Sequence, residues 1–206
     1  MRSLATAVLA TALAGCHAIP AAEREATLET KKVCCTEVSQ FRYEKLATGA
    51  STQFPLDENA PVYRFDGNKS YLKAFEIDEA ANRGLTVKSY FNGPLIGQYL
   101  HPAVLFLDRQ FKPLPGSPLN MQFVQGRMFG GDSNAHMFGG VRIPSATRYV
   151  VFYKQSYALP AAVAQLRPEG SIVMAGTTPI YMSSSSGKRI ELERAPIGEL
   201  AITLVR

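Results

Sequence analysis

Short runs of β-branched and aromatic residues alternate with turn residues from position 33 to the end of the chain. This spacing is typical of β-strands, which are short and are separated by Gly, Pro, Asn and Asp. We therefore predict about ten strands. They are expected at Gln40–Leu46, Ser51–Leu56, Val62–Phe65, Ser70–Ile77, Leu85–Phe91, Ala103–Asp108, Arg148–Tyr153, Ile172–Ala175, Arg189–Glu193 and Leu200–Val205.

One predicted hairpin indicates how the sheet is buried. Asp66 and Gly67 lie between the strands at 62–65 and 70–77, and both residue types tolerate the positive φ angles of tight turns. Within the second strand, Tyr71, Ala74, Phe75 and Ile77 fall roughly on one face, with Lys73 and Glu76 opposite. This distribution predicts a sheet with one buried side.

Two further segments complete the predicted fold. Ala103–Leu107 is apolar on both faces, which predicts a buried central strand. Leu159–Leu166 has Pro160 near its start and a Pro-Glu-Gly stretch after its end, which predicts the one short helix of the domain. The whole pattern predicts an all-β fold, an antiparallel β-sandwich that is jelly-roll-like and carries one short helix. We find no repeat and no second domain.

The N-terminus has a different pattern. A nearly uncharged run rich in Leu, Val and Ala extends from Ser3 to Ala14. A bilayer span needs about 20 apolar residues, so this shorter run has the length of a signal-peptide core. It ends in Leu13, Ala14, Gly15 and Cys16, which resemble the lipobox of bacterial lipoproteins. We therefore expect a lipoprotein signal peptide at 1–15, cleavage before Cys16 and lipidation of the Cys16 thiol.

The residues after Cys16 indicate location and domain boundaries. His17 stands where an aspartate usually marks inner-membrane retention, so we expect a lipid-anchored protein on the periplasmic side of the outer membrane. Residues 16–32 are polar and predict a lipidated tether, with a short helical stretch around Glu23 to Glu29. Residues 33–206 predict a single β-sandwich domain.

Charge narrows the range of partners. The chain has a formal net charge of +5 and a pI near 9.2, but Lys and Arg never form a run longer than two. Export also removes nucleic acid as a partner. A mildly basic surface suits a position close to anionic lipid, so the membrane, through the N-terminal lipid, is the expected partner.

Two cysteines remain after Cys16, and they are adjacent. Neighbouring Cα atoms are about 3.8 Å apart, below the usual spacing of about 4.4–6.8 Å between bridged cysteines. A vicinal disulfide between Cys34 and Cys35 is therefore strained. Two unbridged small hydrophobic residues are an equal alternative, and an intermolecular bridge is a third. The pair lacks the ligand spacing of a zinc site, so we expect no metal.

Catalytic motifs are missing from the sequence. The fragment Ser186, Gly187 and Lys188 lacks the preceding glycine spacing of a phosphate loop, and neither a nucleophile elbow nor a zinc-protease motif occurs. We therefore predict no catalytic residue, no cofactor and no enzymatic activity.

The most unusual segment runs from Phe129 to Gly140, where two glycine pairs bracket Asp132, Asn134 and His136. Two interpretations fit it. One is a mobile ligand loop whose polar side chains bind sugar hydroxyls while an aromatic ring packs on the sugar. The other is a flexible hairpin loop with solvated polar residues.

A family resemblance rests on three stretches, which are residues 101–113, 140–143 and 148–152. In each, an apolar strand pattern resembles the maltose-operon periplasmic protein (MalM-like) family, over roughly residues 36–160. The resemblance implies a non-enzymatic cell-envelope lipoprotein, an accessory or binding module linked to uptake of maltodextrin or another carbohydrate. Carbohydrate or another envelope protein is then the expected partner. A scaffolding lipoprotein and an enzyme with an unrecognised site are the alternatives.

Lipidation gives the first testable prediction. We expect metabolic labelling with a lipid precursor to mark the wild-type protein and to vanish in Cys16→Ser, because only the thiol accepts the diacylglycerol. The measurement is gel autoradiography of membrane fractions. Label that persists in the variant, or wild-type protein recovered in the soluble periplasm, contradicts the prediction.

Overall fold

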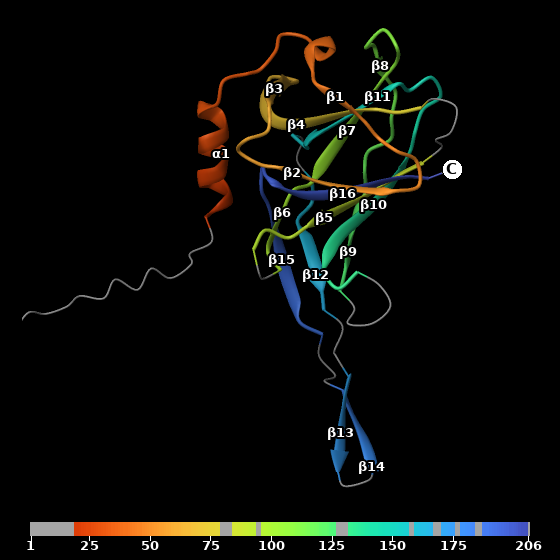
Figure 1. Cartoon of the computed structure of the whole chain (residues 1–206). Coiled ribbons are helices and arrows are strands. Elements are labelled where there is room, and N and C mark those ends of the chain that lie inside the picture. Colours follow the sequence, from red (N-terminus) through yellow and green to blue (C-terminus); the bar gives the residue numbers. More distant parts are fainter. Residues whose placement is uncertain are drawn as a thin grey trace, which may run out of the picture.

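The computed structural model describes residues 19–78, 84–93, 96–126, 132–156, 159–166, 170–175, 178–183 and 187–205. Within them, two large β-sheets form the body, a smaller sheet extends one end, and one α-helix stands at the side (Figure 1). The predicted fold class, an all-β sandwich with one short helix, is confirmed. The predicted signal peptide at 1–15, the lipidation site Cys16, and Phe129 lie outside the described residues.

The first large sheet has the strand order β1-β4-β11-β7-β8, with β3 paired to β4. Its strands are β1 (Tyr43–Lys45), β3 (Val62–Phe65), β4 (Asn68–Glu76), β7 (Pro102–Leu107), β8 (Pro113–Leu114) and β11 (Tyr149–Lys154). All pairings in it are antiparallel except β1 with β4, which is parallel.

The second large sheet is antiparallel throughout, in the order β2-β16-β5-β10-β9. Its strands are β2 (Ser51–Leu56), β5 (Gly84–Tyr90), β9 (Met121–Val124), β10 (His136–Arg142) and β16 (Gly198–Val205). The chain passes repeatedly from one sheet to the other, as it does in jelly-roll folds.

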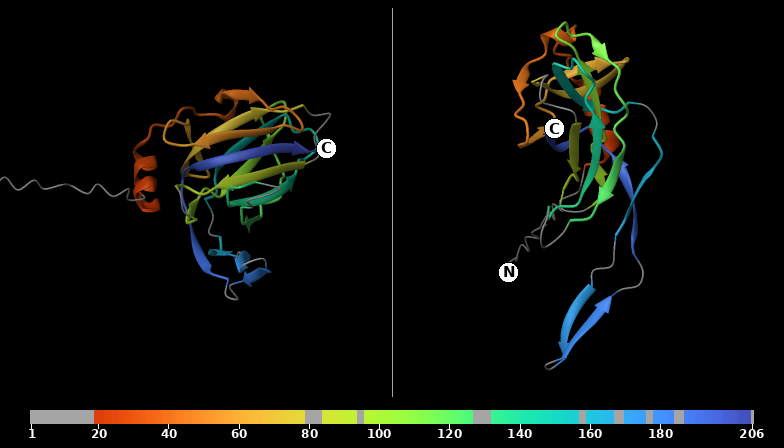
Figure 2. Two further views of the ribbon diagram at one scale, coloured as in Figure 1. Left: turned by 60° about the horizontal axis from the view of Figure 1, so that its bottom comes forward. Right: turned by 90° about the vertical axis from the view of Figure 1, so that its right-hand side faces the viewer.

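A third sheet, in the order β12-β15-β6, extends the body at one end. Its strands are β6 (Gln98–Tyr99), β12 (Ala162–Gln165) and β15 (Arg189–Arg194). Beyond it, β13 (Gly170–Ala175) and β14 (Thr178–Ser183) form a separate two-stranded hairpin that projects away from the body (Figures 1 and 2).

Several predicted strands have the predicted bounds. β2 and β3 match their predicted ranges residue for residue. The β3–β4 hairpin turns at Asp66 and Gly67, with φ angles of 46° and 85°. Strand β7 lies between β11 and β8, and its Phe106 and Leu107 are fully buried, which confirms a buried strand at this position.

Phenylalanines from both large sheets build the core between them. Phe54 of β2 packs on Phe75 of β4 and on Phe152 of β11, with ring centroids 5.1 and 5.7 Å apart. All three side chains are buried. Burial of one such side chain stabilises the fold by about 1.5–3 kcal/mol, so these contacts fix the two sheets against each other.

Strand β4 is buried on both faces, which corrects the prediction of a sheet with one buried side. Tyr71 and Phe75 belong to the core between the sheets, whereas Leu72 and Ala74 belong to a second cluster on the outer face. The prediction placed Ala74 and Phe75 on one face, although neighbouring strand residues point to opposite faces. The same alternation places Lys73 on the face of Phe75.

Aromatic residues cover the outer face of the first sheet, and they come from its own strands and from the segment before β1. Phe41 packs edge-on against Tyr63, with centroids 4.9 Å apart, and Phe65 stacks on Tyr153 at 3.9 Å. Cys35 also packs against this outer cluster. The stretch that begins with the cysteine pair is therefore part of the cover.

Helix α1 (Ala21–Thr30) is packed on the sandwich, within the range predicted to be a tether. Leu28 is fully buried in the core between the sheets. Lys154 of β11 binds both carboxylate oxygens of Glu25, at 2.7 and 2.9 Å, and Lys69 donates to the backbone carbonyl of Lys31 at 2.8 Å. These contacts fix the helix along its length beside β4 (Figure 1).

The helix predicted at Leu159–Leu166 is wrong, because residues 162–165 form strand β12. β12 pairs with β15, and Ala164 is fully buried in a cluster with Tyr99 and Leu192. Ala, Leu and Gln favour a helix in isolation, but this pairing and burial outweigh that weak preference.

The predicted loop at 129–140 ends earlier than expected, because His136–Arg142 forms strand β10 between β5 and β9. A Cβ atom at Gly139 would lie 2.6 Å from the backbone oxygen of Asn120. Glycine is therefore present here to allow a close backbone approach inside a sheet.

Helix docking gives the second prediction. We expect Leu28→Ala to lower the free energy of unfolding by about 2–5 kcal/mol, because it leaves a cavity in the core. The thermal midpoint of the purified chain should fall by about 5–15 °C. The control is Ala26→Ser at an exposed position of the same helix, which should have little effect. An unchanged midpoint in Leu28→Ala would show that the helix is a free tether.

Candidate functional site

A groove of about 550 Å³ opens at one edge of the sandwich. Its walls come from β4, from the segment between Cys34 and Glu44 that includes β1, and from β2 with the loop after it. β1 and β2 are the edge strands of the two large sheets. The groove therefore lies at this edge of the sandwich, and its lining includes Phe41 and Leu72 of the outer cluster as well as Phe54 of the core between the sheets. Its volume is within the range of about 300–1,000 Å³ typical of ligand sites. We call it the edge groove.

The edge groove has apolar walls and a polar rim. The disulfide, Phe41, Phe54 and Leu72 supply apolar surface. The polar side chains are those of Arg42, Glu44, Asp57, Asn59 and Lys73. The structure thus brings together residues that are far apart in the sequence and carry no shared motif.

Strand register explains how a lysine enters this space. Lys73 pairs with Phe152 of β11, whose side chain lies in the core, so Lys73 also faces the second sheet. Its ammonium group lies 2.6 Å from a carboxylate oxygen of Glu44 on β1 and 5.7 Å from the ring centre of Phe75. The Lys73 side chain keeps 27% of its surface exposed, so the ion pair remains in contact with solvent.

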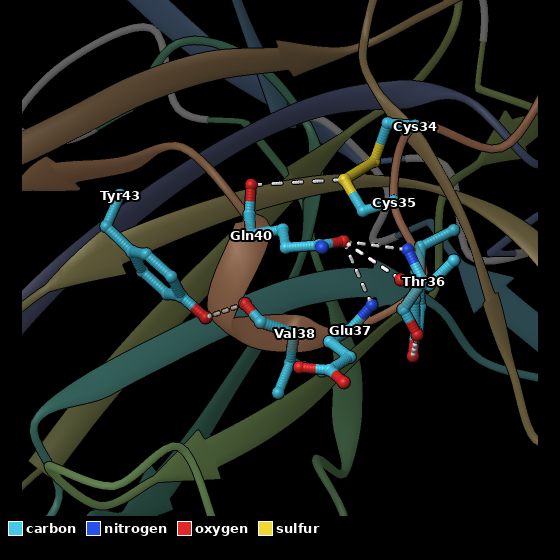
Figure 3. Close-up of a disulfide and its surroundings, with 8 residues drawn as sticks. Cys34, Cys35, Thr36, Glu37, Val38, Gln40 and Tyr43 are labelled. Carbon is cyan, nitrogen blue, oxygen red and sulfur yellow. Dashed lines mark hydrogen bonds between the residues drawn. A yellow bond between two sulfur atoms is a disulfide. The ribbon is translucent and has the colours of Figure 1, made fainter.

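The structure pairs Cys34 with Cys35 in a disulfide (Figure 3). The backbone N–H of Cys34 donates to the carbonyl of Val62 at 2.7 Å. Cys34 is exposed and Cys35 is half-buried. The backbone hydrogen bond of Cys34 therefore joins the start of the groove wall to β3, and the disulfide beside it remains open to solvent.

A tight turn follows the disulfide. Residues 38–40 form a 3-10 turn, so the predicted strand Gln40–Leu46 shortens to Tyr43–Lys45. The Gln40 side-chain oxygen accepts from the backbone N–H groups of Thr36 and Glu37, at 2.9 and 3.3 Å (Figure 3). The Tyr43 hydroxyl donates to the carbonyl of Val38 at 2.8 Å. These bonds hold the wall of the edge groove in one shape.

The candidate loop residues Asp132, Asn134 and His136 do lie together, but far from the edge groove along the strand order. Asp132 accepts hydrogen bonds from Lys88 at 3.0 Å and from the Tyr90 hydroxyl at 2.8 Å, both on β5. His136 is buried, and its Nδ1 donates to the carbonyl of Asn134 at 2.8 Å. Protein atoms thus occupy the Asp132 carboxylate and one ring nitrogen of His136, whereas the Asn134 side chain is exposed.

Electrostatics agree with a structural role for this loop. Burial opposes ionisation of Asp132, but hydrogen bonds from Lys88 and Tyr90 outweigh it and lower the pKa of the carboxyl. Burial, together with the hydrogen bond to Asp132, raises the pKa of Tyr90 to about 12. A carboxylate held between a lysine and a protonated tyrosine fastens the loop to β5.

A smaller polar pocket of about 240 Å³ lies beside α1. It is lined by Lys154, His101 and Arg194, with Glu25 of the helix on the lysine. Burial lowers the pKa of His101, which favours its neutral form. The guanidinium of Arg194 donates to the backbone carbonyl of Leu159 at 3.1 Å. The helix contacts this pocket through the ion pair between Glu25 and Lys154.

The described ranges hold neither a metal-binding cluster nor a membrane-spanning helix. No group of three or more His, Cys, Asp or Glu side chains there is placed to hold a metal ion. None of the described helices is both long and apolar enough to cross a membrane. No family model, curated protein or solved structure significantly matches the chain.

The contacts of Asp132 with β5 give the third prediction. The folded-state pKa of Asp132 is lowered, so its carboxylate stabilises the fold above the unfolded pKa of about 3.9. This contribution is lost as the pH falls through the lowered folded pKa. We expect Asp132→Asn to cost about 2 kcal/mol at pH 7, measured by urea unfolding. The difference from wild type should shrink below about pH 4, and an equal difference at both pH values contradicts the ion-pair account.

Proposed function

We infer that this protein is a non-enzymatic, lipid-anchored cell-envelope binding module that holds a neutral carbohydrate in the edge groove. The observation that carries this proposal is the groove itself, an apolar cleft with a few convergent polar side chains. The resemblance to the MalM-like family, which implies a link to maltodextrin uptake, supports the same ligand class.

The charges of the edge groove favour a neutral ligand. Arg42 and Lys73 are balanced by Glu44 and Asp57, and Lys73 is already paired with Glu44. A phosphate or an ammonium ligand would have to break this pair or compete with the opposite charge. A sugar offers hydroxyls that both donate and accept, so it can bind cations, carboxylates and the Asn59 amide together.

The apolar wall supplies the second requirement of a sugar site. A pyranose ring has an apolar face that packs against flat apolar surface. The disulfide provides such surface on one wall and the exposed Pro55 provides it on the other, whereas Phe41 and Phe54 are buried beneath the groove surface. Packing on these groups would add to hydrogen bonds that contribute only about 1 kcal/mol each.

A second candidate function is scaffolding of another envelope protein. The observation in its favour is the β13–β14 hairpin, which projects from the body as a sheet of only two strands (Figure 2). A two-stranded hairpin is marginally stable alone, and its edges suit pairing with a strand of a partner. Pull-down from envelopes with and without residues 170–183 separates this function from sugar binding.

Groove binding gives the fourth prediction. The variant combines Arg42→Ala with Asn59→Ala. Neither side chain makes a hydrogen bond to another described residue, so the variant should fold normally. Loss of two hydrogen bonds should weaken binding of maltoheptaose by about 2 kcal/mol, or roughly 30-fold. Isothermal titration calorimetry measures the affinity.

The matched control replaces the same residue types outside the edge groove, as Arg142→Ala with Asn134→Ala, at two exposed positions. This variant should bind as wild type does. Equal loss in both variants points to a non-specific effect. If the wild type retains no member of an oligosaccharide panel, the proposed function is wrong.

A further inference from the structure

We propose that the Cys34–Cys35 disulfide is a site of thiol–disulfide exchange that controls the edge groove, and that its reduction by a dithiol partner loosens the groove wall and weakens ligand binding. The ligand-binding half of this inference rests on the proposed function. The structural half, loosening of residues 34–43, does not.

The disulfide is accessible to a reductant in solvent. Cys34 is exposed and Cys35 is half-buried at the groove, so a thiolate from solvent reaches the bond without unfolding of the sandwich. The sequence contains three cysteines, and the third is Cys16, the predicted lipidation site. With Cys16 acylated, the chain itself offers no thiol to exchange with, so the reductant must be another molecule.

The groove wall is anchored at both of its ends. At one end, the Cys34 N–H is bonded to Val62 on β3. At the other end, Phe41 is buried in the outer cluster and β1 is paired with β4. Between these two anchors the disulfide restrains the backbone of two residues. Release of ordered residues gains conformational entropy, which opposes the few hydrogen bonds of the turn.

Cys35 also contacts Gln40, in the turn that follows the disulfide. Its Sγ lies 4.0 Å from the Gln40 carbonyl oxygen (Figure 3). A sulfur in a disulfide carries no proton to donate, whereas a thiol is a weak donor. The disulfide therefore holds the Cys35 sulfur beside Gln40, the residue whose side chain closes the turn at Thr36 and Glu37, and reduction frees this sulfur to move away.

The exchange balances as a two-electron reduction. A thiolate of the dithiol attacks Cys34 Sγ, the Sγ–Sγ bond breaks, and Cys35 leaves as a thiolate that takes up a proton. The second thiolate of the reductant then attacks the mixed disulfide and releases Cys34, which is also protonated. The partner departs as a disulfide, having supplied both electrons and both protons.

The test compares the full mature chain before and after treatment with dithiothreitol. Iodoacetamide should label no thiol at positions 34 and 35 before treatment and both afterwards, as read by mass spectrometry. Hydrogen exchange of the amides from residue 34 to 43 should become about tenfold faster on reduction. Amides of Asp132–Arg142 serve as the internal control and should not change. The variant Cys34→Ser with Cys35→Ser should resemble the reduced protein and ignore dithiothreitol.

Affinity for maltoheptaose should fall about tenfold on reduction in the wild type and stay constant in the double variant. Labelling of both thiols before treatment, or unchanged exchange at 34–43 after reduction, overturns the proposal. If neither redox state binds maltoheptaose, the proposed function fails for this ligand, and the exchange rates alone then decide whether the disulfide controls the wall.

Discussion

Burial of the first sheet on both faces is the constraint on which the rest of the structure depends. Phe75 and Phe152 need the second sheet on one side, while Leu72 and Val151 need cover on the other. An apolar outer face left in water would cost free energy in proportion to its area. The cover includes the chain from the disulfide through Phe41, so the same packing that stabilises the sheet places the cysteine pair at its edge.

The edge groove is explained by a charged pair at one edge of that sheet, where both side chains face the second sheet. Lys73 and Glu44 occupy positions that face the second sheet, and they pair with Phe152 and Phe75 of the core. Full burial of two charges is expensive even when they are paired, so a solvated opening is favoured over close contact of the sheets at this edge. The opening provides a ligand site, and the disulfide in its wall links that site to the redox state of its surroundings.

The sequence was sufficient for the fold class, and local patterns located β2, β3 and the hairpin turn at Asp66. It failed at β12 and β10, where pairing with distant strands outweighed the local preferences of alanine and glycine. It also missed the edge groove, whose residues come from three separated segments. Of the groove residues, only the cysteine pair could be singled out from the sequence. The one further signal of the groove was Lys73, which lies within an otherwise apolar face of its strand.

The most direct test is a titration of ¹⁵N-labelled protein with maltoheptaose, followed by amide chemical shifts. The account predicts shifts that saturate and are confined to residues 34–44, 54–61 and 72–74, the three segments that line the edge groove. Shifts centred on residues 132–136, or a spectrum that does not change, would contradict it.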